Sequence, residues 1–291
     1  MPSLLSSVRA AASRLSPHEV VEKAERPIAV ALVASSSSGY ADMEDFLVPA
    51  DLPPQRRREV LNVIHRDGDS GNPDRFDLVL YEQGLPCPIN AFTFFRDDPE
   101  RTLGEIMKER NDLALPLARR FEAFRKPVID RVIHSVAREN ALFAVATALP
   151  NVVPNLLELP WAVGEFASDT AFLTINQVRM AFLIGAASGC DVGYMEQKGQ
   201  IATIVGSAFG WRTLARELVG KIPLGGGLIP KGAIAYAGTY VVGKGLERIN
   251  RSGGTYSSNE RREHFDSAFE RGKAVVEVVL AGLKNRKLAK T

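Results

Sequence analysis

The feature that most constrains the fold of this chain is an apolar run, Ile28–Ala34, that leads directly into a polar turn. A short continuous apolar segment of this kind is typical of a strand that is buried on both faces of a parallel sheet. The turn consists of Ser35–Ser38 and Gly39, and we predict a helix around Met43–Leu47. A strand, a turn and a helix in this order predict an α/β unit with right-handed crossovers.

The segment that follows continues this α/β pattern. We predict a helix over Gln55–Ile64 and strands over Phe76–Tyr81 and Ile89–Phe95, the last rich in aromatic and β-branched residues. The loop Asp67–Pro73 resembles the start of a calcium loop. However, Leu78 stands where the bidentate glutamate belongs, so we expect no metal site there.

The pattern becomes helical after Asp98, which is placed to cap a helix that begins at Pro99. Another helix is predicted to begin at Pro127, and the capping box Ser257–Glu260 opens the last helix. Further helical stretches are expected over Trp161–Ser188, Gln197–Leu218 and Ile229–Ile249. We therefore predict an α+β fold in which a small, mostly parallel α/β domain precedes a glycine-rich helical bundle. The expected divisions are an N-terminal amphipathic helix (1–26), the α/β domain (27–98), the helical domain (99–250), and an amphipathic helix with a basic tail (251–291).

Glycines recur at helical spacing in the middle of the chain, at Gly185, Gly189 and Gly193 and at Gly206 and Gly210. This spacing lets two helix backbones approach closely, either in a membrane or in a soluble bundle, and it is compatible with a homo-oligomer. The longest uncharged stretch has 17 residues and contains two prolines. A spanning helix needs about 20 apolar residues, so we expect no isolated transmembrane helix, while a helix lying on a membrane surface stays open.

Composition excludes several classes of function. Lys and Arg total 36 against 34 Asp and Glu, and a net charge of +2 gives no reason to expect a nucleic-acid partner. Two cysteines, Cys87 and Cys190, are too few for a disulfide scaffold and fit a reducing, cytoplasmic compartment.

The known catalytic motifs are absent from the sequence. Val33–Tyr40 lacks the lysine and the following hydroxyl of a phosphate-binding loop, and no zinc, serine-hydrolase or redox motif occurs. We therefore predict no catalytic residue, no metal and no cofactor. Backbone N–H groups at a helix start can hold an anion, which makes Ser38 and Gly39 the candidates for an anion site.

Polar side chains set among apolar helical segments need partners inside the bundle. The predicted interaction cluster comprises Asp169, Asn176, Gln177, Arg179, Asp191, Arg212, Arg216 and Glu217. We expect these groups to pair with one another and hold the helices in register, and the alternative is that they converge on an unrecognised site.

Several less common residues fall in order between about 125 and 249. They are Asn140, Pro150-x-x-x-Pro154, Asp169, Asn176–Met180, Gly189–Asp191, Trp211–Glu217, Ile222-Pro223 and Ile229–Thr239. This stretch resembles the YcjF-like domain, a bacterial family of unknown function found beside or after Era-like GTPase domains. The resemblance implies a helical, often membrane-associated module without an established reaction. The α/β part is similar to a reduced GTPase-like or Rossmann-like unit that lacks the N-K-x-D and D-x-x-G elements.

Two functions follow as expectations. The first is a non-enzymatic helical module in a GTPase-related bacterial system, cytoplasmic and peripheral to or partly inserted in the inner membrane. It would associate with a membrane surface or a protein partner, a GTPase being one that the resemblance suggests. The alternative is a nucleotide-binding regulator with a degenerate phosphate loop and no hydrolysis.

Overall fold

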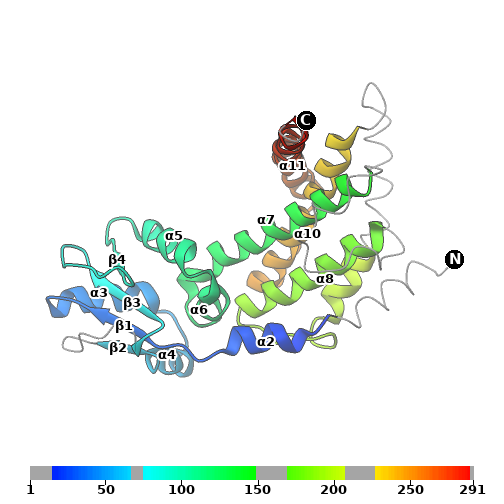
Figure 1. Cartoon of the computed structure of the whole chain (residues 1–291). Helices are drawn as coiled ribbons and strands as arrows, with labels where there is room; N and C mark the ends of the chain where they lie inside the picture. Colours follow the sequence, from blue (N-terminus) through cyan, green and yellow to red (C-terminus); the bar gives the residue numbers. More distant parts are fainter. Residues whose placement is uncertain (1–14, 67–74, 149–168, 207–226, 289–291) are drawn as a thin grey trace. The chain divides into compact units, whose positions relative to one another are not determined.

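The computed structural model describes residues 15–66, 75–148, 169–206 and 227–288, except for the side chains of Asp169 and of residues 283–288. The chain divides into two compact units. The N-terminal unit comprises His18–Asp130 and Ala186–Cys190, and the helical unit comprises the other described residues. The first unit contains a parallel sheet and the second is helical, so the chain is α+β, as predicted (Figure 1).

The N-terminal unit is built on a four-stranded parallel sheet in the order β2-β1-β3-β4. Its strands are β1 (Val30–Val33), β2 (Ile64–Arg66), β3 (Leu78–Glu82) and β4 (Phe92–Phe94). β1 lies inside the sheet, where Val30 pairs with Ile64 of β2 and with Leu78 of β3. Val30 and Leu32 on one face and Ala31 on the other are all buried, which confirms that the apolar run is a strand covered on both faces.

Helix α3 (Ser37–Leu47) packs on β1 and β3 through the fully buried side chains of Met43 and Leu47. The prediction of a helix around this segment is confirmed, as is the Asp98 cap, whose carboxylate accepts from the Arg101 N–H. The other helices that lie wholly or mostly in this unit are α2 (Pro17–Glu25), α4 (Pro54–Leu61), α5 (Pro99–Glu109), the 3₁₀ helix η2 (Asn111–Leu113) and α6 (Ala114–Arg120).

The helix predicted over Gln55–Ile64 is wrong in its last turn, because α4 ends at Leu61 and Ile64 begins β2. Val60 and Ile64 are four residues apart and fit a helical pattern. Pairing with β1 overrides this local pattern, since a strand of three residues gains its stability from the neighbouring strand. The predicted strand Ile89–Phe95 is also too long, because Ile89 lies in a turn and is fully exposed.

The helix predicted to begin at Pro127 begins earlier, and α7 runs from Glu122 to Ala146 with Pro127 inside it. A proline is tolerated in the first turn of a helix, and deeper in a helix it removes one backbone hydrogen bond. Phe121 and Phe124 are both fully buried, and their packing fixes the extra first turn despite the proline.

The helical unit is organised around α10 (Leu228–Ser252), which confirms the helix predicted over Ile229–Ile249. Gly253, with a φ of 68°, ends α10, and α11 (Ser258–Leu288) packs along it. The predicted capping box is confirmed, because the Ser257 N–H donates to the Glu260 carboxylate at 2.8 Å and the Glu260 N–H donates back to Ser257 Oγ at 3.3 Å. Part of α7, most of α8 (Asp169–Ala187) and the helical residues 198–206 are the other described helical segments of this unit.

Glycines bring three helices very close to α10. A Cβ atom on Gly272 of α11 would lie 2.9 Å from the Ala233 Cα atom, and one on Gly232 would lie 2.5 Å from Val276 of α11. A Cβ atom on Gly243 would lie 2.7 Å from Ile133 of α7 and 3.1 Å from the Met180 sulfur of α8. The bundle is therefore rich in glycine at its helix contacts.

The glycine face predicted from Gly185, Gly189 and Gly193 is wrong. Helix α8 ends at Ala187, and Gly189 has a φ of 76°, in the left-handed region that commonly terminates helices. The three glycines therefore do not share one helix. Gly206 is the last described residue of its segment, and Gly210 lies outside the described residues.

The variant Gly272→Ala tests the close contact between α10 and α11. The added methyl group meets backbone atoms of Ala233, so the helices must separate, and we expect a loss of about 1–3 kcal/mol in the free energy of unfolding. The control is Gly282→Ala in the same helix, where an added Cβ meets nothing within 4 Å. We expect this control to gain about 0.5–1 kcal/mol from helix propensity. Urea unfolding measures both, and equal effects of the two variants would contradict the packing described.

Candidate functional site

The strand order places a topological switch point between β1 and β3. The chain leaves β1 toward β2 on one side and then returns to place β3 on the other side. In open parallel sheets, ligands bind in the crevice that this reversal opens at the carboxyl ends of the strands. Ser35, after β1, and Glu82, the last residue of β3, lie at this edge.

The Glu82 carboxylate occupies the start of α3, where a bound anion would be expected. Both the Ser35 N–H and the Ser35 hydroxyl donate to Glu82 Oε2, at 2.8 and 2.7 Å. Ser36 caps α3 by accepting from the Gly39 N–H at 3.0 Å. A Cβ atom on Gly39 would lie 2.5 Å from the Glu82 carboxyl carbon, so the carboxylate rests on the first turn of the helix.

Of the two predicted anion-site residues, Ser38 and Gly39, only Gly39 contacts the Glu82 carboxylate. Gly39 lies under the Glu82 carboxylate, whereas Ser38 is exposed in the first turn of α3. The hydrogen bonds from Ser35 lower the pKa of Glu82 below its usual 4.5 and keep the carboxylate ionised. The bond from the Ser35 hydroxyl contributes most, and the bond from the Ser35 N–H contributes less. An internal anion therefore takes the place that a phosphate holds in nucleotide-binding folds.

Part of the predicted polar cluster forms a buried network between α7, α8 and α10. Asn140 of α7, fully buried, donates to Thr239 Oγ1 of α10 at 2.8 Å and accepts from Asn176 Nδ2 of α8 at 2.9 Å. Gln177 donates to the same Thr239 hydroxyl at 3.3 Å. Arg179 donates to Asn176 Oδ1 at 3.0 Å and forms an ion pair with Glu139.

The network pairs its members with one another, and this arrangement fits the expectation that they hold the helices in register. Of the network's members, Asn176, Gln177 and Arg179 belong to the predicted cluster, whereas Glu139, Asn140 and Thr239 do not. Asp191 is exposed outside α8. Asp169 begins α8, and its side chain is not described. Arg212, Arg216 and Glu217 lie outside the described residues.

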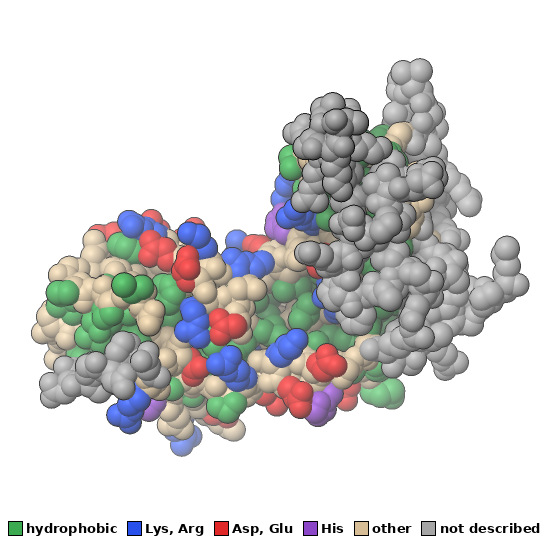
Figure 2. Space-filling model, viewed as in Figure 1, with side chains coloured by type: hydrophobic (Ala, Val, Ile, Leu, Met, Phe, Trp, Pro, Cys, Tyr) green, Lys and Arg blue, Asp and Glu red, His purple; other side chains and the backbone are tan. Residues whose placement is uncertain are grey.

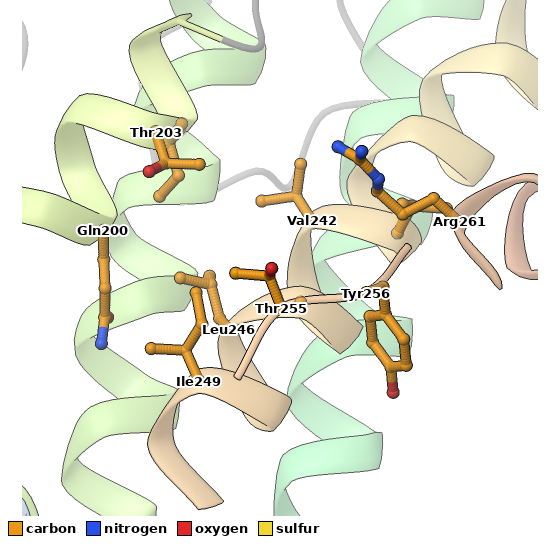
Figure 3. A pocket seen from close by; sticks show the side chains of 11 residues that line it. Gln200, Thr203, Val242, Leu246, Ile249, Thr255, Tyr256 and Arg261 are labelled. Atoms are coloured by element: carbon orange, nitrogen blue, oxygen red, sulfur yellow. The ribbon is translucent and has the colours of Figure 1, made fainter. Parts of the chain in front are cut away.

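An apolar pocket of about 240 Å³ lies beside α10 in the helical unit (Figure 3). The aliphatic side chains of Ile204, Val241, Val242, Leu246 and Ile249 line it. Its polar lining comes from Gln200, Thr203, Thr255, Tyr256 and Arg261. The combination of an apolar wall and a few polar groups is typical of small-molecule sites.

The C-terminal end of α11 exposes apolar side chains. Val278 is 72% exposed, and Ala274 and Ala281 are exposed as well. Glu277 is the one acidic residue from Ala274 to the end of the sequence, and the sequence then continues with Lys284, Arg286, Lys287 and Lys290. Apolar and basic residues thus adjoin at this end of the helix.

The described part of the chain shows no metal-binding cluster and no charged patch of one sign on the face seen in Figure 2. Acidic and basic side chains intermingle on the face of the N-terminal unit seen in Figure 2. No group of three or more His, Cys, Asp or Glu among the described residues could hold a metal ion. Thr170–Ala187 of α8 is long and apolar enough to cross a membrane, but 78% of it is buried inside the protein. A buried core helix passes the same test.

Comparisons with family models, with curated proteins and with solved structures return no match to this chain. The resemblance of residues 125–249 to the YcjF-like family therefore stays a prediction.

The variant Ser35→Ala tests whether the Glu82 carboxylate is held by this loop. It removes the hydroxyl that contributes most to the lowered pKa of Glu82, so we expect that pKa to rise toward 4.5. Because the folded pKa lies below the unfolded value, these bonds stabilise the fold fully above about pH 4.5, and the stabilisation is lost as the pH falls through the folded pKa. NMR titration of the Glu82 carboxyl carbon measures the pKa, and an unchanged value in S35A would contradict the assignment.

The variant Thr239→Val tests the buried network while nearly preserving side-chain shape. It removes the acceptor shared by Asn140 and Gln177, and buried donors without a partner cost about 1–3 kcal/mol of stability. Thr203→Val is the control, because the Thr203 hydroxyl is exposed and donates within its own helix to the Gly199 carbonyl. We expect the control to stay within about 0.5 kcal/mol of the parent in urea unfolding. Equal free energies of unfolding for T239V and T203V would contradict a stabilising role of the network.

Proposed function

We propose that this protein is a non-enzymatic binding module that attaches to an anionic membrane surface through the C-terminal end of α11. The observation that carries the proposal is the exposed Val278 on a helix whose sequence continues into a basic tail. Apolar side chains enter the boundary between headgroups and acyl chains, and each Lys or Arg near an anionic surface adds about 1 kcal/mol. The two attractions act together where apolar and basic residues adjoin.

The rest of the chain supports a peripheral attachment. The one helix of suitable length and composition in the described residues, within α8, is mostly buried, so its apolar face is already used in the bundle. A cytoplasmic protein bound to the inner membrane from one side fits this arrangement, because anionic lipids on that leaflet attract basic segments. An acidic protein surface, such as that of a GTPase partner, is the competing occupant that the family resemblance suggests.

The alternative of a nucleotide-binding regulator has less support. A phosphate at the start of α3 would have to displace the Glu82 carboxylate, which Ser35 holds through two hydrogen bonds. The loop also contributes no lysine to the terminal phosphates. We therefore do not propose nucleotide binding as a second function.

Flotation with vesicles of neutral lipid and of neutral lipid mixed with phosphatidylglycerol tests the proposal. We expect the full chain to float with the anionic vesicles only, and Val278→Glu to weaken this binding by about tenfold, because a charge opposes burial in the interface. Ser267→Glu is the control, since it adds the same charge at an exposed position earlier in α11. Failure of the full chain to float, or equal flotation of V278E and the parent, would contradict the proposal.

A further inference from the structure

We propose that the pocket beside α10 binds a single-chain carboxylate, a fatty acid of medium length, with its chain against α10 and its carboxylate at Arg261. This inference goes beyond surface attachment, because it concerns a monomeric ligand and a different part of the helical unit. The pocket involves the end of α10 and the start of α11, whereas the proposed surface contact uses the other end of α11.

The shape and wall of the pocket fit an acyl chain. Val241, Leu246 and Ile204 are nearly or fully buried, and their side chains form an aliphatic wall. A volume of about 240 Å³ is many times the ~15 Å³ that a cavity needs to hold one water molecule, so the pocket has room for several chain carbons. Polar ligands have little to bind along this wall.

The charge at the rim selects an anionic head group. Arg261 is exposed, and its guanidinium donates to the Ser257 carbonyl and to Ser258 Oγ only at 3.4 Å, near the upper limit for a hydrogen bond. Among the described residues it forms no ion pair, while the neighbouring Arg248 is paired with Glu260. In Figure 3 the Arg261 guanidinium and the Thr203 side chain stand on opposite sides of the hollow. A carboxylate at the rim would accept a pair of charge-assisted bonds from Arg261.

Gly245 is the residue that keeps the pocket open. It lines the pocket in the C-terminal part of α10, and a Cβ atom there would meet nothing within 4 Å. Gly232 and Gly243 of the same helix differ, because neighbouring helices would crowd a Cβ atom at those positions. Helix packing therefore explains Gly232 and Gly243 and leaves Gly245 without a packing role. A larger residue at this position would grow into the cavity.

Calorimetric titration of the full chain with decanoate, below its micelle concentration, tests the inference. We expect saturable binding, and we expect Gly245→Leu to weaken it at least about tenfold by filling the cavity, with a melting temperature equal to or above that of the parent. Gly104→Leu is the matched control, since Gly104 lies exposed inside α5 and an added Cβ meets nothing within 4 Å there. We expect Gly104→Leu to bind decanoate like the parent.

The head group is tested with Arg261→Gln and with 1-decanol. We expect R261Q to weaken decanoate binding by about tenfold and to leave decanol binding unchanged, because only the carboxylate forms the ion pair. Absence of decanoate binding, or equal binding by G245L and the parent, would overturn the site, and equal decanoate binding by R261Q would overturn the anionic ligand. Flotation of G245L with anionic vesicles should match the parent, which separates this inference from the surface proposal.

Discussion

Gly232, Gly243 and Gly272 bring the neighbouring helices so close to α10 that a methyl group at any of the three would crowd its neighbours. This close approach is the constraint on which the rest of the helical unit depends. It sets Thr239 within hydrogen-bond reach of α7 and α8, and it aligns α11 along α10. The side of α10 that Gly245 occupies is not packed in this way, and there the pocket forms. Protein interiors are close-packed. The positions of small and large residues along α10 therefore decide which of its faces contacts a neighbouring helix and which lines the pocket.

In the N-terminal unit, a charge from within the chain lies at the place where an open parallel sheet offers a binding crevice. A parallel sheet with a switch point offers a polar crevice at its carboxyl edge and a helix start with free N–H groups. Glu82 supplies the negative charge from within the chain, and Gly39 leaves room for it. The Ser35 N–H and the Gly39 N–H are then bonded within the chain, to Glu82 and to Ser36, whether or not any phosphate is present.

Elements with a strong local signal were predictable from the sequence, and elements fixed by distant partners were not. Local sequence alone predicted the strand within Ile28–Ala34 and the capping box Ser257–Glu260, and the structure contains both. Strand β2 forms because it pairs with β1. The helical spacing of Val60 and Ile64 favoured a helix there, so the strand was not predicted. In the site, polar residues inside apolar helices pointed to Asn176 and Arg179, but Glu139 looks like a surface residue until α8 is packed against α7. The pocket has no sequence signal, because it is a space left between helices.

Hydrogen–deuterium exchange of the full chain, with and without anionic vesicles, tests the proposed membrane attachment most directly. Attachment through α11 predicts slower exchange of amides in residues 274–288 when vesicles of phosphatidylglycerol are added, because the lipid surface suppresses the local opening that exchange requires. It also predicts no change in residues 30–48, which contain β1 and α3. Protection confined to another part of the chain, or no protection anywhere, would contradict the attachment.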